Sequence, residues 1–128
     1  MNKAYALDAS ALLCLLLQER GADVVLKALP DCVISAVNLS EVVAKLSDRG
    51  GDPATIEAAL SALDLDIIAF DGEQARMAGL LRRQTQPFGL SLGDRACLAL
   101  ACLRKAVALT CDADWAKLEI GCAVELAR

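Results

Sequence analysis

The chain has 128 residues, of which 56% are hydrophobic and only 3% aromatic, and its formal net charge is -4 with no histidine. This length fits one domain, residues 1–128, and leaves little room for a second. The absence of histidine and of any Cys-x-x-Cys spacing argues against a zinc site. The apolar run near the start of the chain, Ala11 to Leu17, is far shorter than the ~20 residues of a membrane helix.

Three further expectations come from the same composition. The apolar surface of these small, mostly aliphatic side chains is larger than a small monomer easily buries, which predicts a subunit or partner interface. Scattered cysteines without an export signal favour a reducing cytoplasm. The acidic charge is unusual for a nucleic-acid binder, because affinity for the phosphate backbone usually comes from Lys and Arg.

Apolar periodicity predicts short strands alternating with helices along the whole chain. Each predicted strand is a short, mostly apolar run of four or five residues, whereas the predicted helices show apolar residues at intervals of three and four. The expected strands are residues 3–7, 32–35, 66–70, 106–110 and 122–126. The expected helices are residues 11–18, 22–29, 39–49, 53–63, 71–83 and 93–104, with a polar loop at 85–89 and a helical turn at 114–118.

This alternation indicates an α/β fold with a central parallel sheet of about four to five strands and helices on both faces. The predicted helix 93–104 is apolar all round, so we expect it to be central. No internal repeat or linker interrupts the pattern.

Acidic residues fall where such a sheet places its ligands, beyond the carboxyl ends of the strands. Asp8 follows the first predicted strand and Asp112 follows the fourth. Glu41 and Asp94 fall in the first turn of two predicted helices. All four carboxylates could therefore converge on one edge of the sheet.

Each acid also has a purely structural interpretation. Asn38 to Glu41 and Ser91 to Asp94 both have the spacing of a helix capping box. Asp112 could cap the short helical turn after it, and Asp8 could simply end a strand. Glu41 lies roughly 150° from the centre of the apolar stripe on its helix, so we expect it to point toward solvent or a cleft.

Convergence would require a cation. Two carboxylates ~4 Å apart repel by about 4 kcal/mol at an effective dielectric of 20, which is a large share of the stability of a small domain. Oxygen ligands without His or Cys favour Mg²⁺ or Mn²⁺. Such an ion polarises a phosphoryl oxygen and lowers the pKa of a water, which is the chemistry of phosphodiester hydrolysis.

Four segments, in their order and spacing, resemble the PIN-domain nucleases and, among them, the VapC-type toxins of type II toxin–antitoxin pairs. The resemblance runs nearly end to end, and it implies a PIN-like three-layer sandwich. The segments are LDASA at residues 7–11, SAVNLSEV at 35–42, GLSLGDRAC at 89–97 and TCDADW at 110–115.

The resemblance implies an endoribonuclease that uses Mg²⁺ or Mn²⁺ to cleave tRNA or rRNA, leaving a 5′-phosphate and a 3′-hydroxyl. It further implies a homodimer inhibited by a VapB-type antitoxin, with which it could form a higher-order complex. Asp8, Glu41 and Asp94 match the family's metal-binding acids, and Asp112 is preferred to Asp114 as the fourth. The matching supporting residues are Ser10, Asn38 and Thr110.

Basic residues must hold the RNA, and Arg95 is the first candidate because it adjoins Asp94. Arg82, Arg83, Lys45 and Arg49 are further candidates, although a solvated helix face is the more common explanation of such residues. Trp115 is expected mainly to pack in or beside the core.

Two other functions fit parts of the sequence. A degenerate PIN-like domain could bind a partner without catalysis. A haloacid-dehalogenase-like phosphatase is also α/β with an acid after the first strand, but it requires Asp-x-Asp where this chain has Asp8-Ala9-Ser10.

Overall fold

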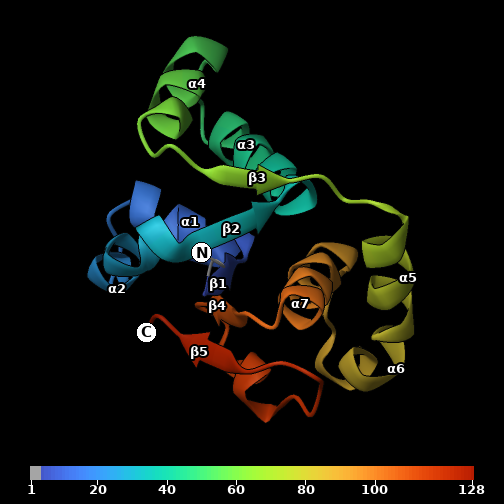
Figure 1. Ribbon diagram of the computed structural model, residues 1–128. Helices are drawn as coiled ribbons and strands as arrows, with labels where there is room; N and C mark the ends of the chain where they lie inside the picture. Colours follow the sequence, from blue (N-terminus) through green and yellow to red (C-terminus); the bar gives the residue numbers. More distant parts are fainter. Residues whose placement is uncertain (1–3) are drawn as a thin grey trace.

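The computed structural model describes residues 4–128, and its five strands form one parallel sheet in the order β3-β2-β1-β4-β5 (Figure 1). The predicted strands are confirmed with small changes of length, and Lys3 lies outside the described residues. The strands are β1 Tyr5–Leu7, β2 Cys32–Ser35, β3 Asp66–Ile68, β4 Val107–Thr110 and β5 Val124–Leu126.

Seven α-helices and three short 3-10 turns connect the described strands. The helices are α1 Ala9–Leu16, α2 Ala22–Ala28, α3 Ala36–Asp48, α4 Pro53–Ser61, α5 Gly72–Leu80, α6 Arg82–Thr85 and α7 Leu92–Arg104. The 3-10 turns are η1 Leu29–Asp31, η2 Gln86–Phe88 and η3 Ala113–Lys117. None of the described helices is long and apolar enough to cross a membrane.

Alternation along the strands divides the interior into two cores, which gives the predicted three layers. In β1, Ala6 joins a cluster with α5 and α7, whereas Leu7 joins a cluster with α1, α2 and α3. In β4, Ala108 and Leu109 divide in the same way. Because side chains of a strand alternate between faces, a sheet buried on both sides needs apolar residues at consecutive positions.

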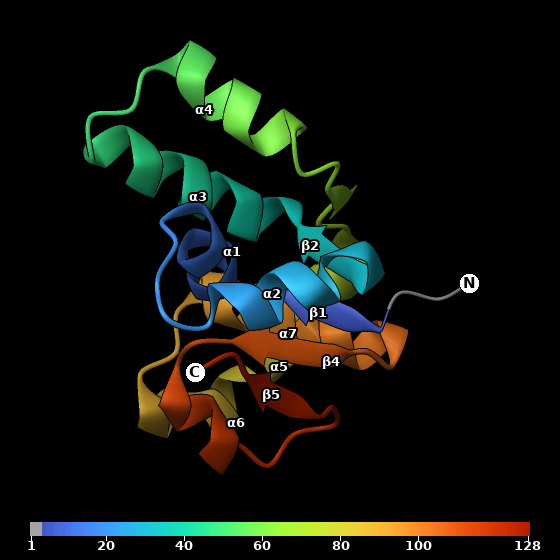
Figure 2. The ribbon, with the colours of Figure 1, turned by 90° about the vertical axis from the view of Figure 1, so that its left-hand side faces the viewer.

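The prediction of a central helix at residues 93–104 is confirmed. The α7 side chains from Ala96 to Ala101 are almost completely buried, and α7 packs against β1, β2 and β4 on one side and α5 on another. Figure 2 shows α4 lying along α3 at the end of the sheet formed by β3.

The expected polar loop at residues 85–89 is wrong at its first residue. The helix predicted over 71–83 is instead two helices that meet at Leu81, and the second ends at Thr85, which is fully buried. The Thr85 hydroxyl donates to the carbonyl of Leu81 at 2.9 Å. A threonine can be buried in this way because the helix itself satisfies its hydroxyl.

Candidate metal and nucleic-acid site

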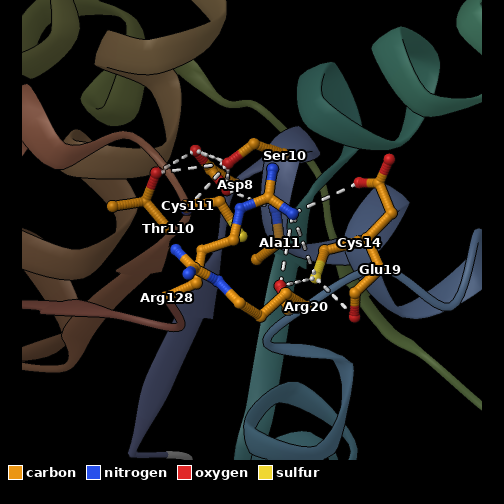
Figure 3. Close-up of polar contacts among 9 residues, drawn as sticks. All are labelled: Asp8, Ser10, Ala11, Cys14, Glu19, Arg20, Thr110, Cys111 and Arg128. Carbon is orange, nitrogen blue, oxygen red and sulfur yellow. Dashed lines mark hydrogen bonds and ion pairs between the residues drawn. The ribbon is translucent and has the colours of Figure 1, made fainter.

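Asp8 lies where β1 ends and α1 begins, and its carboxylate is the most constrained of the predicted acids. Only 3% of the residue is exposed. Oδ1 accepts from the Ala11 amide at 2.8 Å, which caps α1, and Oδ2 accepts from the Thr110 hydroxyl at 2.5 Å. The Ser10 hydroxyl donates to the same carboxylate, as Figure 3 shows.

Burial sets the ionisation of this carboxylate. Desolvation raises the pKa of Asp8 to about 6, although the hydrogen bonds from Thr110, Ala11 and Ser10 oppose the increase. The negative charge of Asp94 adds a smaller upward contribution. A nearby cation would reverse this balance, because it favours the charged carboxylate.

The end of β4 is joined to Asp8 through hydroxyl groups. The Thr110 hydroxyl accepts from the Asp112 amide at 3.0 Å while it donates to Asp8, and the Ser10 hydroxyl accepts from the Cys111 amide at 2.9 Å. These bonds fix the start of the loop that carries Asp112 relative to Asp8.

Glu41 reaches the site from α3, and Asn38 holds it against α7. The Asn38 amide nitrogen donates to Glu41 Oε1 and to the Gly93 carbonyl, each at 2.8 Å. The Glu41 carboxylate lies directly over Gly93, where any Cβ would overlap it. Gly93 therefore leaves the space that Glu41 occupies.

The expectation of a capping box from Asn38 to Glu41 is wrong. The helix begins earlier, because Ser35 at the end of β2 is its cap and accepts from the Val37 amide at 3.2 Å. Asn38 is therefore inside α3, where it is 1% exposed and shares the buried face with Val42. Counting 100° per residue, Glu41 lies roughly 80° from that pair, which places it at the border of the core rather than opposite to it.

Asp94 does form the predicted capping box at the start of α7. Its Oδ2 accepts from the Ser91 amide at 2.9 Å, and the Ser91 hydroxyl accepts from the Asp94 amide at 3.2 Å. Capping occupies one carboxylate oxygen, so the structural and the functional interpretations of this residue are compatible. Asp94 and Asp8 line the same pocket, and the charge of Asp94 contributes to the raised pKa of Asp8.

The two candidates for the fourth acid differ in their surroundings. Asp112 lines the same pocket as Asp8, Glu41 and Asp94. Asp114 is absent from the pocket lining, and its carboxylate lies 3.3 Å from the Lys117 ammonium. The geometry favours Asp112, although Asp112 also caps the turn that follows it by accepting from the Asp114 amide.

The pocket has a volume of about 470 Å³ and combines acids with a basic border. Lys45 and Arg49 follow Glu41 at intervals of four residues on α3, so all three fall on one side of the helix. Arg128 enters from the other end of the chain and pairs with Glu19 at 3.4 Å, and both also line the pocket (Figure 3). Glu19 and Arg128 were not predicted, and no sequence motif marks them.

The donor set of this pocket fits a hard divalent cation, with carboxylate oxygens from four separate elements and no His or Cys in its lining. The side-chain amide oxygen of Asn38, Oδ1, is buried beside Glu41 and has no hydrogen-bond partner. Within residues 4–128, however, no three acidic, His or Cys side chains are close enough together to hold a metal as they stand. Binding would require carboxylates of this pocket to move closer together.

The other predicted nucleic-acid contacts lie elsewhere. The Arg95 guanidinium donates to the Ala78 carbonyl of α5 at 2.9 Å, and Arg82 and Arg83 border a separate hollow around α6. Trp115 is 1% exposed and packs in the α7 core, as expected.

Comparison with known proteins agrees with the fold. The PIN domain model matches residues 5–121. The structure is similar to a "Toxin-antitoxin complex from Klebsiella pneumoniae", with 24% identity, a TM-score of 0.76 and 98% of each chain covered. It is also similar to VapBC2 from Rickettsia felis bound to a promoter DNA fragment, with 19% identity, a TM-score of 0.72 and coverage of 96% of this chain and 98% of the other.

A third similar structure is VapBC-5 from Mycobacterium tuberculosis, with 26% identity, a TM-score of 0.61 and 98% of each chain covered. No curated protein sequence matches the chain significantly. The family model spans most of the chain, from β1 to the segment before β5, and includes all four candidate acids. The chain belongs to the PIN-domain family.

Proposed function

We propose that the protein is an endoribonuclease that depends on Mg²⁺ or Mn²⁺ and acts as the toxin of a VapBC-type toxin–antitoxin pair in the cytoplasm. The observation that carries the proposal is the pocket that Asp8, Glu41, Asp94 and Asp112 line together, although they come from four separate parts of the chain. Membership of the PIN-domain family and similarity to structures of toxin–antitoxin complexes support it.

In this proposal the four acids hold the cation, and Asp8 has the central position. Above pH 6 the Asp8 carboxylate is charged in most molecules, and hydrogen bonds from Ser10 and Thr110 hold its two oxygens in place. Asn38 orients Glu41 in the same way. When bound, the cation would polarise the phosphodiester and lower the pKa of the attacking water.

RNA would reach the acids across the basic border of the pocket. Lys45 of α3 and Arg49, which follows the last residue of α3, line this border, and they would contact phosphates of the RNA backbone. Arg95, Arg82 and Arg83 would contact RNA only outside this pocket. With a net charge of -4, the protein would depend on the cation and this local border for affinity.

Exposed apolar side chains support the proposed protein partners, a VapB-type antitoxin and a second copy of the chain. Leu80 is 75% exposed, Leu26 58% and Leu92 55%. These residues lie on α5, α2 and α7, so the apolar surface is spread over more than one face. Covering several faces fits a toxin that both dimerises and binds an antitoxin.

The direct test is cleavage of tRNA and rRNA by purified, antitoxin-free protein with Mg²⁺ or Mn²⁺. We expect 5′-phosphate products, no cleavage with EDTA, and a loss of at least about 100-fold in Asp8→Asn, because even outer partners of metal ligands typically contribute 10- to 100-fold. Asp114→Asn is the matched control and should keep activity. Full activity in Asp8→Asn would refute the proposed site, and inactivity of the wild type with both metals would favour a degenerate, partner-binding domain.

A further inference from the structure

Two of the six cysteines come from distant parts of the chain and meet beside α7. Cys102 lies near the end of α7, and Cys122 lies in the segment that leads to β5. The Cys122 sulfur is 4.0 Å from the Leu98 carbonyl, which is one helical turn before Cys102. Gly121 packs against the other sulfur, because a Cβ at that position would lie 4.0 Å from Cys102 Sγ.

The surroundings of this thiol pair distinguish its two members. Cys122 and the backbone of Gly121 both stabilise the thiolate form of Cys102 and so lower its pKa. The Cys122 side chain makes the largest contribution in lowering the pKa of Cys102 to about 7, against the opposing effect of burial. Cys102 is therefore the first of the two to become a thiolate, which is the nucleophilic form of cysteine.

Exposure separates this pair from the cysteines of the core. Cys102 and Cys122 are both half-buried, so a small reagent can reach them. Cys97, on the same helix, is completely buried, and desolvation raises its pKa well above the usual range. All six cysteines lie within residues 4–128, and none of them forms a disulfide there.

We propose that Cys102 and Cys122 are a modification site at which a small disulfide, such as glutathione disulfide, oxidises the two thiols to an intramolecular disulfide. The Cys102 thiolate attacks one sulfur of the reagent, which forms a mixed disulfide and releases the first small thiolate. Cys122 loses its proton and attacks the Cys102 sulfur, which forms the protein disulfide and releases the second. The protein loses two electrons and two protons, and the small disulfide gains them as two thiols.

The cross-link would join α7 to the segment before β5 and would enclose β4 and η3 in a loop. Neither cysteine lines the acidic pocket, so this inference does not depend on the proposed nuclease function. We expect the oxidised protein to keep any activity of the pocket and to unfold at a higher temperature, because the cross-link restricts the unfolded chain.

The test uses the reduced, folded protein, incubated with glutathione disulfide, quenched with acid, alkylated and digested with trypsin. The sequence places Cys122 alone in the peptide 118–128 and Cys102 with Cys97 in the peptide 96–104. We expect these two peptides to be linked, with fragmentation placing the bond on Cys102. Cys14 and Cys111, in peptides 4–20 and 106–117, give an internal comparison.

Two variants distinguish the steps of the reaction. Cys122→Ser keeps a hydroxyl donor for Cys102 but cannot close the bond, so it should stop at a mixed disulfide on Cys102. Cys102→Ser should leave Cys122 unmodified, and equal circular dichroism spectra of the reduced proteins would show that both variants fold. Free Cys102 after oxidation, a persistent mixed disulfide in the wild type, or a bond between two copies of the chain would each overturn the proposal.

Discussion

The Asp8 carboxylate is held in a buried position by its hydrogen bonds, although burial disfavours the charged form that a metal ligand needs. It caps α1 and receives hydroxyl hydrogen bonds from Ser10 and Thr110, yet burial still raises its pKa to about 6. A ligand that stabilises the charged form of Asp8, such as a divalent cation, would lower this pKa again and so stabilise the folded protein at neutral pH.

The shift predicts that stability depends on pH in the metal-free protein. Between pH 3.8 and about 6, the folded state keeps a proton on Asp8 that the unfolded state has lost, so the free energy of unfolding falls as pH rises. The loss is about 3 kcal/mol, since one pKa unit corresponds to ~1.4 kcal/mol.

Urea unfolding in EDTA at a series of pH values measures this effect. Asp8→Asn is the matched control, because it keeps a capping oxygen but cannot ionise, and the difference between the two proteins removes the contribution of the other acids. The wild type should lose stability relative to Asp8→Asn from pH 4 to pH 7. A constant difference, or one of opposite sign, would show that Asp8 is not destabilised by burial.

At the scale of elements, the contact between α3 and α7 sets the position of Glu41. Asn38 bridges Glu41 and the Gly93 carbonyl, and Gly93 provides the space for the carboxylate. We predict that Gly93→Ala displaces Glu41 and lowers metal affinity and RNA cleavage about 10- to 100-fold, as changes beside metal ligands typically do. The fold should persist, because the displaced atoms end a flexible side chain.

Gly79→Ala is the matched control, since Gly79 is an exposed helical glycine with no atom near its missing Cβ. It should raise stability by up to ~1 kcal/mol through helix propensity and leave cleavage unchanged. Isothermal titration with Mn²⁺ and a cleavage assay check both variants. Equal metal affinity in Gly93→Ala and the wild type would contradict the role given to this contact.

The same two helices show how far the sequence could predict the site. Asp8 and Asp112 could be placed because each follows a strand of a parallel sheet, and these ends share one edge. The orientation of α3 could not be predicted, because its apolar stripe faces two surfaces. Val42 enters the core, whereas Leu39 and Val43 line a groove toward α4.

Other parts of the site depend on contacts that no local pattern records. Glu19 and Arg128 form an ion pair at the pocket although they are 109 residues apart in the sequence. The meeting of Cys102 with Cys122 likewise depends on how the segment before β5 returns to α7. The five strands, by contrast, could be predicted because each is a short, mostly apolar run. The central strands β1, β2 and β4 are buried on both faces of the sheet, whereas the edge strands β3 and β5 are partly exposed.

At the scale of the whole molecule, the fold gathers acids that are remote in sequence into one pocket and leaves most basic residues outside it. Asp8, Glu41, Asp94 and Asp112 share the pocket with Lys45, Arg49 and Arg128. A bound divalent cation would offset the repulsion among the acids, and the basic border would meet the phosphates of RNA.

The central claim is that these four acids share a divalent cation, and anomalous X-ray diffraction from crystals soaked in Mn²⁺ tests it most directly. The account predicts an anomalous peak within coordination distance of the Asp8 carboxylate and of at least two carboxylates among Glu41, Asp94 and Asp112. That peak should be lost in Asp8→Asn crystals of the same form. Saturating Mn²⁺ that gives no peak in this pocket, or gives peaks only at other acids such as Asp114, would contradict the account.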